Sequence, residues 1–358
     1  MPDISEKIID QVRNANDKRI ALNIIGRGSK SFYGRTATGK TLNVAGHSGI
    51  VSYEASELVL TARAGTALSE IKSVLSEHNQ VLSFDPPYYD DEGSLGGTLA
   101  CNQSGPSRPW SGSVRDMVLG VRLINGAGQN LRFGGQVMKN VAGFDVARLQ
   151  AGAMGSLGVI TEISLKVMPK PAHSATLVCE IDTAADALTA MNHYRHHATP
   201  ISGACWHQGK FYLRLSGAHG AVESAGIEFS KRYASAKLLD AEHKFWQKLR
   251  DQALDFFAGS SPLWRFSMKA SAPLASMNDE CLIDWGGAQR WLRSEKNSEE
   301  LLNELPNGNG QISLFRHGDR TADVFHQPSS VAIKLHQQLK HSFDANGIFN
   351  SGRLYSWL

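Results

Sequence analysis

The sequence predicts an α+β protein of two domains. Its 358 residues exceed the roughly 100–200 residues of one typical domain. Segments with the patterns of strands and helices follow one another in mixed order, which favours α+β layers over a regular strand–helix repeat. Glycine is unevenly distributed along the chain, since 21 of the 34 glycines lie in residues 1–171. The proline-containing segment "VMPKPAHS" ends this glycine-rich part. We therefore expect a glycine-rich first domain and a bulkier second domain.

The elements of the first domain can be predicted in order along the chain. Residues 1–19 predict an amphipathic helix with Ile4, Ile8, Ile9 and Val12 on one side, without the uninterrupted apolar core of a secretory signal. The next elements are the strands "IALNIIG" and "ELVLTARAGT", the helix "ALSEIKSVLSEHNQ", the hairpin "DMVLGVRLINGAGQNLRFGG" and the strand "GSLGVITEISLKVMP". Helical spacing of apolar residues in the helix and an Asn-Gly turn signal in the hairpin support these predictions.

Composition and charge exclude several classes of protein. A net charge of +3 with mixed basic and acidic residues does not favour a nucleic-acid partner. No apolar run approaches the roughly 18 residues that a membrane span requires. The four cysteines form no C-x-x-C pair, so we predict neither an iron–sulfur cluster nor any other metal site in this chain. Scattered, reduced thiols are typical of a cytoplasmic protein.

The segment "GRTATGKT", residues 34–41, fits the phosphate-binding pattern of NTPases as text. A working phosphate loop joins a buried strand directly to a helix, whose N-terminus faces the phosphates. Here the nearest strand ends at Gly26, and the residues that follow Thr41 predict strand and turn. We therefore interpret the segment as a surface loop and reject an NTPase.

Three glycine-rich segments could hold a cofactor. The first, "IIGRGSKSFYG", matches the start of G-x-G-x-x-G, but Ser31 replaces the third glycine and no helix pattern follows, so a Rossmann fold is not supported. Its successive small residues could still turn several amides toward one anion, with hydroxyls from Ser29 and Ser31. An ordinary turn between a strand and a loop is the alternative.

The second segment, "GSLGGTLACNQSG", contains nothing larger than leucine and glutamine, as a cofactor lying flat on the backbone would require. A tightly packed helix turn is the alternative. The third segment, "KNVAGFDVARLQAGAMGSLGVITEISLKVMP", predicts a short helix over residues 145–150 and a glycine-bracketed turn into a strand. Each segment alone is consistent with packing, but three in one domain favour a cofactor site.

In order and spacing, these segments resemble the FAD domain of the vanillyl-alcohol oxidase/p-cresol methylhydroxylase superfamily. The C-terminal "FDANGIFNSGRLY" is similar to the closing segment of that superfamily. Within it, the chain resembles the FAD-binding subunits of bacterial glycolate oxidase. The resemblance implies a two-lobed FAD-binding domain in residues 1–171, a second α+β cap domain in 172–329 that binds substrate or a partner, and a segment, 330–358, that returns to the FAD domain.

The resemblance also implies roles for individual residues. The pyrophosphate of FAD would be wrapped by Arg27, Gly28, Ser29, Lys30 and Ser31. The ribityl chain and flavin would lie along Ser94, Gly96, Gly97, Thr98, Ser104 and Gly105, with Asn350 near the flavin edge. The backbone of Gly158, Val159 and Ile160 would contact the adenine half. The first loop has no histidine for covalent attachment, so we expect noncovalent FAD.

The catalytic residues are less complete than the superfamily pattern. Catalytic 2-hydroxyacid dehydrogenases of this type carry a segment similar to "HxGDGNxH", whereas this chain has "FRHGDR", residues 315–320, without the second histidine. Arg316 and His317 are the candidates for a cationic and titratable pair near the flavin. A surface loop is the alternative.

The function implied by the resemblance is transfer of a hydride from a small 2-hydroxyacid, such as glycolate, to FAD. The electrons would pass to an iron–sulfur subunit, within a complex that also holds a second flavin subunit. We expect a cytoplasmic location, with the inner membrane reached only through partner subunits. Two alternatives stay open: an FAD-holding relay or structural subunit without its own substrate oxidation, and a self-sufficient oxidase or nicotinamide-dependent reductase.

Overall fold

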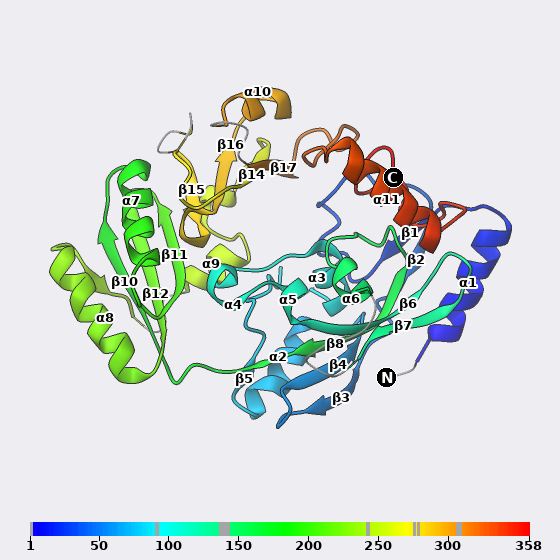
Figure 1. Cartoon of the computed structure of the whole chain (residues 1–358), viewed down its shortest axis with the longest axis horizontal. Coiled ribbons are helices and arrows are strands. Elements are labelled where there is room, and N and C mark those ends of the chain that lie inside the picture. The colour runs from blue at the N-terminus through cyan, green and yellow to red at the C-terminus, as the bar shows by residue number, and fades with distance from the viewer. Residues whose placement is uncertain are drawn as a thin grey trace. The chain divides into compact units, whose positions relative to one another are not determined.

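The computed structural model describes residues 3–89, 93–135, 144–240, 244–274, 277, 280–305 and 310–358. The chain forms two compact units (Figure 1). The first comprises Met1–Ser104, Ser113–Pro169 and Asp319–Leu358, and the second comprises Gly105–Gly112 and Lys170–Gly318. The chain thus passes between the units after residues 169 and 318, where the sequence predicts boundaries after 171 and 329.

A five-stranded antiparallel sheet forms the centre of the first unit. Its strand order is β3 (Ile50–Glu54), β4 (Val59–Arg63), β8 (Val159–Lys166), β6 (Val118–Ile124) and β7 (Asn130–Gly134). Leu68, Ile71 and Leu75 of α2 (Leu68–Glu77) share a core with this sheet, because their helical spacing puts them on one face. The predicted helix, strands and hairpin are confirmed here, and so is the α+β class.

A smaller layer of the first unit is built around α1 (Ser5–Asp17). Strands β1 (Leu22–Ile25) and β2 (Lys40–Asn43) pair in parallel. The predicted apolar face of α1 is buried against them together with Phe349 of the C-terminal segment. The remaining elements of this unit are α3 (Leu95–Cys101), α5 (Val114–Met117), α6 (Val146–Leu149), α11 (Ser330–Phe343) and the short pair β5 (Gln80–Val81) and β9 (Met168–Pro169).

The segment that resembles a phosphate loop is partly strand. Lys40 and Thr41 begin β2, opposite Leu22 and Asn23 of β1, so the predicted surface loop is wrong at its end. The parallel pairing with β1 provides hydrogen bonds that the local sequence does not reveal. The next element after β2 is the strand β3 and not a helix. A phosphate loop of an NTPase would lead directly into a helix, so this order agrees with the rejection of that interpretation.

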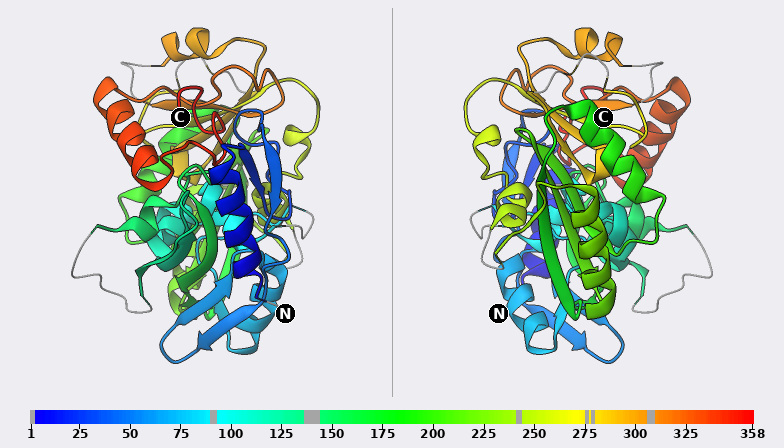
Figure 2. Two further views of the ribbon diagram at one scale, coloured as in Figure 1. Left: turned by 90° about the vertical axis from the view of Figure 1, so that its right-hand side faces the viewer. Right: turned by 90° about the vertical axis from the view of Figure 1, so that its left-hand side faces the viewer.

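The second unit contains an eight-stranded sheet. Its order is β13 (Lys237–Leu238), β10 (His173–Glu180), β12 (Lys210–Gly217), β11 (Ile201–His207), β15 (Leu282–Asp284), β16 (Gln289–Arg293), β14 (Leu263–Ser267) and β17 (Gln311–Arg316). Helices α7 (Ala184–Arg195) and α8 (His219–Arg232) pack on β10, β11 and β12 (Figure 2). The other α-helices among the described residues of this unit are α4 (Arg108–Ser111), α9 (Phe245–Arg250) and α10 (Ser298–Asn303). No helix among the described residues is long and apolar enough to cross a membrane.

Residues 105–112 belong to the second unit, although the sequence predicts them in the first domain. The reason lies in one tryptophan of the second unit. The indole N–H of Trp285 donates to the carbonyl oxygen of Gly105 at 3.0 Å, and the Arg108 guanidinium lies 4.6 Å from the centre of the Trp285 ring. These contacts join segments far apart in sequence, so no local pattern predicts them.

We predict that His47 makes the first unit sensitive to acid. Its side chain is fully buried, and Nδ1 accepts a hydrogen bond from the Ile4 amide at 3.3 Å. Burial lowers the pKa of His47, and the Asp3 carboxylate, 3.8 Å from Nδ1, partly opposes this effect. Because the unfolded chain binds the proton more tightly, stability should fall as the pH drops below about 6.5, the ordinary pKa of histidine.

Urea unfolding at pH 7.5 and pH 5.5 measures this effect. The wild-type protein should lose more stability between these values than a His47→Asn variant, which cannot titrate. Equal losses in both proteins would show that His47 does not contribute to the acid sensitivity.

Candidate cofactor site

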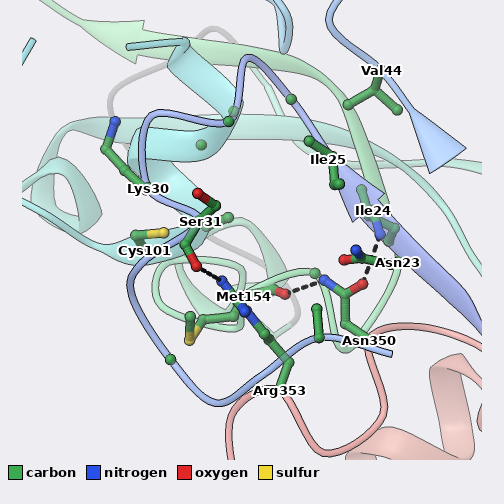
Figure 3. Close-up of a pocket in the computed structure, with 18 of the residues that line it drawn as sticks. Asn23, Ile24, Ile25, Lys30, Ser31, Val44, Cys101, Met154, Asn350 and Arg353 are labelled. Atoms are coloured by element: carbon green, nitrogen blue, oxygen red, sulfur yellow. Dashed lines mark hydrogen bonds between the residues drawn. The ribbon is translucent and has the colours of Figure 1, made fainter. Parts of the chain in front are cut away.

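A cavity of about 380 Å³ lies within the first unit. Its walls come from β1 and the loop after it, from Ala64 just beyond β4, from α3, from the loop before β8, and from the C-terminal segment (Figure 3). Eleven of the residues that the sequence predicts to bind FAD line it: Arg27, Gly28, Ser29, Lys30, Ser31, Ser94, Gly96, Gly97, Gly158, Ile160 and Asn350. The structure thus brings residues from all three glycine-rich segments to one cavity.

The loop after β1 turns sharply beside the cavity. Gly28 has a φ of +83°, in the left-handed region that favours glycine, and a Cβ there would meet no atom of the described residues within 4 Å. The carbonyl oxygen of Gly28 accepts a hydrogen bond from the Ser31 amide at 3.0 Å. The loop therefore presents its backbone to open space at Gly28, where a ligand can approach closely.

The second glycine-rich segment forms the helix α3 rather than a flat support. Ser94 caps this helix, since its hydroxyl accepts from the Gly97 amide at 3.3 Å. Gly96 packs against Ala64 of the chain just beyond β4, with its amide donating to the Ala64 carbonyl at 2.8 Å. The alternative of a tightly packed helix turn is therefore the one observed, yet the turn still lines the cavity.

The C-terminal segment fastens two walls of the cavity together. The Asn350 Oδ1 accepts from the Ile24 amide at 2.8 Å, and its Nδ2 donates to the Met154 carbonyl at 2.6 Å (Figure 3). The guanidinium of Arg353 donates to the carbonyl oxygens of Ser31 at 2.9 Å and Arg35 at 2.5 Å. Asn350 therefore connects β1 to the loop before β8, and Arg353 holds the first loop.

A buried ion pair, Lys340 and Asp344, stabilises this C-terminal segment. The ammonium of Lys340 donates to the Asp344 carboxylate at 2.7 Å, to the Ser156 carbonyl at 2.8 Å and to the Phe349 carbonyl at 2.7 Å. The same carboxylate accepts from the amides of Ile348 at 3.0 Å and Phe349 at 2.8 Å. Burial lowers the pKa of Lys340, and the hydrogen bond and charge of Asp344 oppose this shift.

The cavity is cationic along one part and apolar at one end. No aspartate or glutamate is among the described residues that line it, whereas five basic side chains do: Arg27, Lys30, Arg35, Arg320 and Arg353. Ile24, Ile25 and Val44 line the end away from Lys30 (Figure 3). Cations suit a diphosphate and an apolar end suits an aromatic ring, so these residues fit a dinucleotide such as FAD.

Cys101 also lines the cavity, beside Lys30 and Arg353. Burial raises the pKa of this thiol, and the two cations only partly oppose the shift. The protonated thiol is therefore the form present at neutral pH. Because the thiolate is the nucleophilic form, this environment does not favour a covalent bond to a ligand.

Four of the predicted residues do not line the cavity. Thr98 is fully buried in α3, where its hydroxyl donates to the Ser94 carbonyl at 2.9 Å. The Ser104 hydroxyl accepts from the Val114 amide at 3.3 Å, and Gly105 belongs to the second unit. Val159 points into the core around α1, because successive residues of a strand alternate between its two faces.

Several lining residues were not predicted, notably Arg35, Cys101, Met154, Arg320 and Arg353. Arg353 lies three residues after Asn350 in the closing segment "FNSGR", so that segment carried a signal for it. Arg35 and Arg320 come together through the fold and have no local pattern. The part "KNVAG" of the third glycine-rich segment, residues 139–143, lies outside the described residues.

The predicted catalytic pair lies in the second unit. Arg316 ends β17, where it pairs with Leu263 of β14, and His317 follows with a φ of +60°. Their catalytic role stays a prediction.

An α+β fold with a cationic, glycine-lined cavity defines a protein that binds a dinucleotide cofactor, and comparisons identify that cofactor. The FAD binding domain family matches residues 1–134. Over 359 residues, covering 99% of both chains, the sequence is 44% identical to the glycolate oxidase subunit GlcE of Escherichia coli (strain K12). The chain therefore belongs to the glycolate oxidase GlcE family of FAD-dependent oxidoreductase subunits, and its cofactor is FAD. The resemblance inferred from the glycine-rich segments is confirmed.

More distant relatives match part of the chain. The mitochondrial D-lactate dehydrogenase (cytochrome) of Arabidopsis thaliana is 26% identical over 52% of this chain and 33% of its own length. The glycolate oxidase subunit GlcD of Bacillus subtilis (strain 168) is 31% identical over 38% of this chain and 30% of its own. An alkyldihydroxyacetonephosphate synthase structure shares the fold, with a TM-score of 0.68 at 16% identity over 96% of this chain and 74% of that one.

Proposed function

We propose that this chain oxidises a small 2-hydroxyacid, such as glycolate, as the FAD-holding subunit of a glycolate oxidase complex, and passes the electrons to an iron–sulfur subunit. The observation that carries the proposal is the 44% identity to GlcE along 99% of both chains. The cationic cavity supports it, because it fits the diphosphate of FAD.

In this proposal the protein binds and orients while FAD, when bound, supplies the hydride acceptor. Arg27, Lys30 and Arg353 hold the diphosphate, and Gly28 lets the backbone approach it closely. Arg316 pairs with the carboxylate of the substrate, and the imidazole of His317 accepts the proton of its hydroxyl group. Replacing Arg316 by alanine should therefore raise KM for glycolate strongly and leave FAD content unchanged.

The electrons need a route out of this chain. Its four cysteines are scattered in sequence without a C-x-x-C pair, so the proposal places the clusters on a second polypeptide. We predict that co-expression with an iron–sulfur subunit and a second flavin subunit raises dye-linked glycolate oxidation more than tenfold. That ratio corresponds to about 1.4 kcal/mol in the limiting barrier. Steady-state rates of the chain alone and of the complex measure it, and equal rates would make this chain a complete enzyme.

The segment "FRHGDR" favours one other function. Because it lacks the second histidine of the superfamily pattern, the chain could hold FAD as a relay while a partner oxidises the substrate. Anaerobic mixing of the purified chain with a panel of 2-hydroxyacids and with NADPH separates the cases. Bleaching of the flavin by glycolate supports the proposal, bleaching by no hydroxyacid supports the relay, and rapid bleaching by NADPH supports a reductase.

A further inference from the structure

The first unit has a second hollow, a groove of about 400 Å³, outside the cofactor cavity. Its walls come from α6, from the loop before β8, from α11 and from the C-terminal segment. Five leucines line it: Leu149, Leu157, Leu339, Leu354 and Leu358. A hollow of leucine side chains that opens to the surface is typical of a binding site for an apolar group.

The apolar surface continues from this groove along α11, which lies at the edge of the first unit (Figure 2). Val331 is 67% exposed, Leu335 is 55% exposed, and Leu339 lines the groove. The spacing of four residues puts all three side chains on one face of the helix. Eight residues of helix extend about 12 Å, so the row is two turns long. A row of this kind packs against another helix, and it is longer than a small ligand would cover.

The side chains around this apolar surface are mainly basic. Arg115 and Arg148 line the groove, and Lys334 is exposed on α11, which contains no aspartate or glutamate. Among the described residues that line the groove, Asp145 is the only acidic one, and its Oδ2 lies 3.4 Å from the Arg148 Nε. Two copies of this chain would bring like charges together at such an interface, whereas an acidic partner would be attracted.

The groove and the cofactor cavity share one loop. Met154 and Gly155 line the cavity, whereas their neighbours Ala153 and Ser156 line the groove. A protein that occupies the groove therefore contacts the loop that forms one wall of the FAD site. Because electron transfer slows steeply as the distance between redox groups grows, this position suits a subunit that takes electrons from the cofactor.

We infer that the α11 surface, defined as Val331, Leu335 and the groove, binds an acidic amphipathic helix of the iron–sulfur subunit. The apolar face of that helix lies along α11, and one of its large apolar side chains fills the groove, as in other complexes of a helix with a groove. Its carboxylates pair with Arg115 and Lys334. The inference rests on the proposed function, in which an iron–sulfur subunit accepts the electrons.

The test uses the complete complex. The tagged, FAD-loaded chain is co-expressed with the iron–sulfur subunit and the second flavin subunit, and iron per tagged chain is measured after purification. Leu335→Glu puts a charge in the middle of the apolar row, where it also repels an acidic partner. It should lower the retained iron at least tenfold. The isolated variant should keep its FAD and its stability, because Leu335 is largely exposed.

Ile227→Glu is the matched control. Ile227 is 52% exposed, close to the value for Leu335, but it lies on α8 of the second unit. This variant should retain as much iron as the wild-type complex. An equal loss of iron from both variants would contradict the inference, because it would show an effect of any added surface charge.

A charge reversal tests the electrostatic part of the inference. Arg115→Glu should weaken binding of the purified iron–sulfur subunit at least threefold at low salt, and the difference should shrink at high salt. Arg132→Glu changes an exposed arginine on β7 and should leave the affinity unchanged. Equal affinities of the two variants at low salt would contradict an acidic partner at this surface.

The outcomes separate this inference from the proposed function. Full retention of the iron–sulfur subunit by Leu335→Glu would overturn the inference and leave the proposed function intact. Loss of the second flavin subunit alone would assign the surface to that subunit. A dimer of the isolated chain that Leu335→Glu converts to a monomer would assign it to a second copy, so either result would overturn the inference. A wild-type complex without the iron–sulfur subunit would refute the proposed function and the inference together.

Discussion

Asp344→Ala is expected to destabilise the first unit by about 3–5 kcal/mol, the usual cost of removing one partner of a buried ion pair. The substitution leaves the Lys340 ammonium buried with carbonyl oxygens only, and it removes the acceptor of two backbone amides, those of Ile348 and Phe349. Because this pair supports the segment that carries Asn350, bound FAD should be lost as well. Urea unfolding and the flavin absorbance of the purified variant measure the two effects.

A surface ion pair in the same unit provides the control. The Arg122 Nε lies 2.9 Å from the Glu162 Oε2, and the Arg122 side chain is 43% exposed. Arg122→Ala should cost less than about 1 kcal/mol and leave FAD bound. An Asp344→Ala protein that is as stable as this control and keeps its FAD would refute the role assigned to the buried pair.

Gly96→Ala is expected to have the second largest effect. A Cβ on Gly96 would lie 2.7 Å from the Cβ and 2.9 Å from the carbonyl oxygen of Ala64, so α3 would have to move away from the sheet. Overpacking of this kind costs about 1–3 kcal/mol. The movement also displaces Ser94 and Gly97, so FAD should bind more weakly. Thermal unfolding and fluorescence titration with FAD measure these changes.

Gly97→Ala is the control for Gly96→Ala. It separates the effect of a clash with Ala64 from the effect of replacing any glycine of α3 by alanine. Within the described part of the chain, the only atom less than 4 Å from a Cβ on Gly97 would be the Ser94 hydroxyl oxygen, at 3.2 Å. Gly97→Ala also gains about 0.5–1 kcal/mol of helix propensity, which offsets this contact. Its stability should therefore stay within about 1 kcal/mol of wild type, since the two terms are of similar size. Equal losses at Gly96 and Gly97 would contradict the packing of α3 described here.

Much of the first unit could be predicted because its signals are local. The helical spacing in α1 and α2 and the alternation in the hairpin β6–β7 are written in short stretches of sequence. The three glycine-rich segments were predicted to share a cofactor site, and they meet at one cavity. The flat support expected for Gly96 and Gly97 is a helix instead, because close packing on Ala64 and a flat ligand surface both require small residues.

The parts that sequence could not predict depend on contacts between distant residues. The Lys340 ammonium reaches the Ser156 carbonyl, and the Arg353 guanidinium reaches that of Ser31. Nothing near Lys340 in the sequence distinguishes it from an exposed lysine of an amphipathic helix. Similarly, Gly105 follows Ser104 in the predicted flavin segment, but its hydrogen bond with Trp285 holds it in the second unit.

We expect this chain alone to hold FAD noncovalently in the cavity of its first unit. Acid precipitation of the purified chain, followed by measurement of flavin in the supernatant and the pellet, tests this expectation. The cavity predicts one FAD per chain. The histidine-free first loop and the protonated Cys101 thiol predict that acid releases all of this FAD into the supernatant. Yellow colour that stays with the pellet would contradict noncovalent binding, and a chain that contains no flavin and takes up none would contradict the cavity as its site.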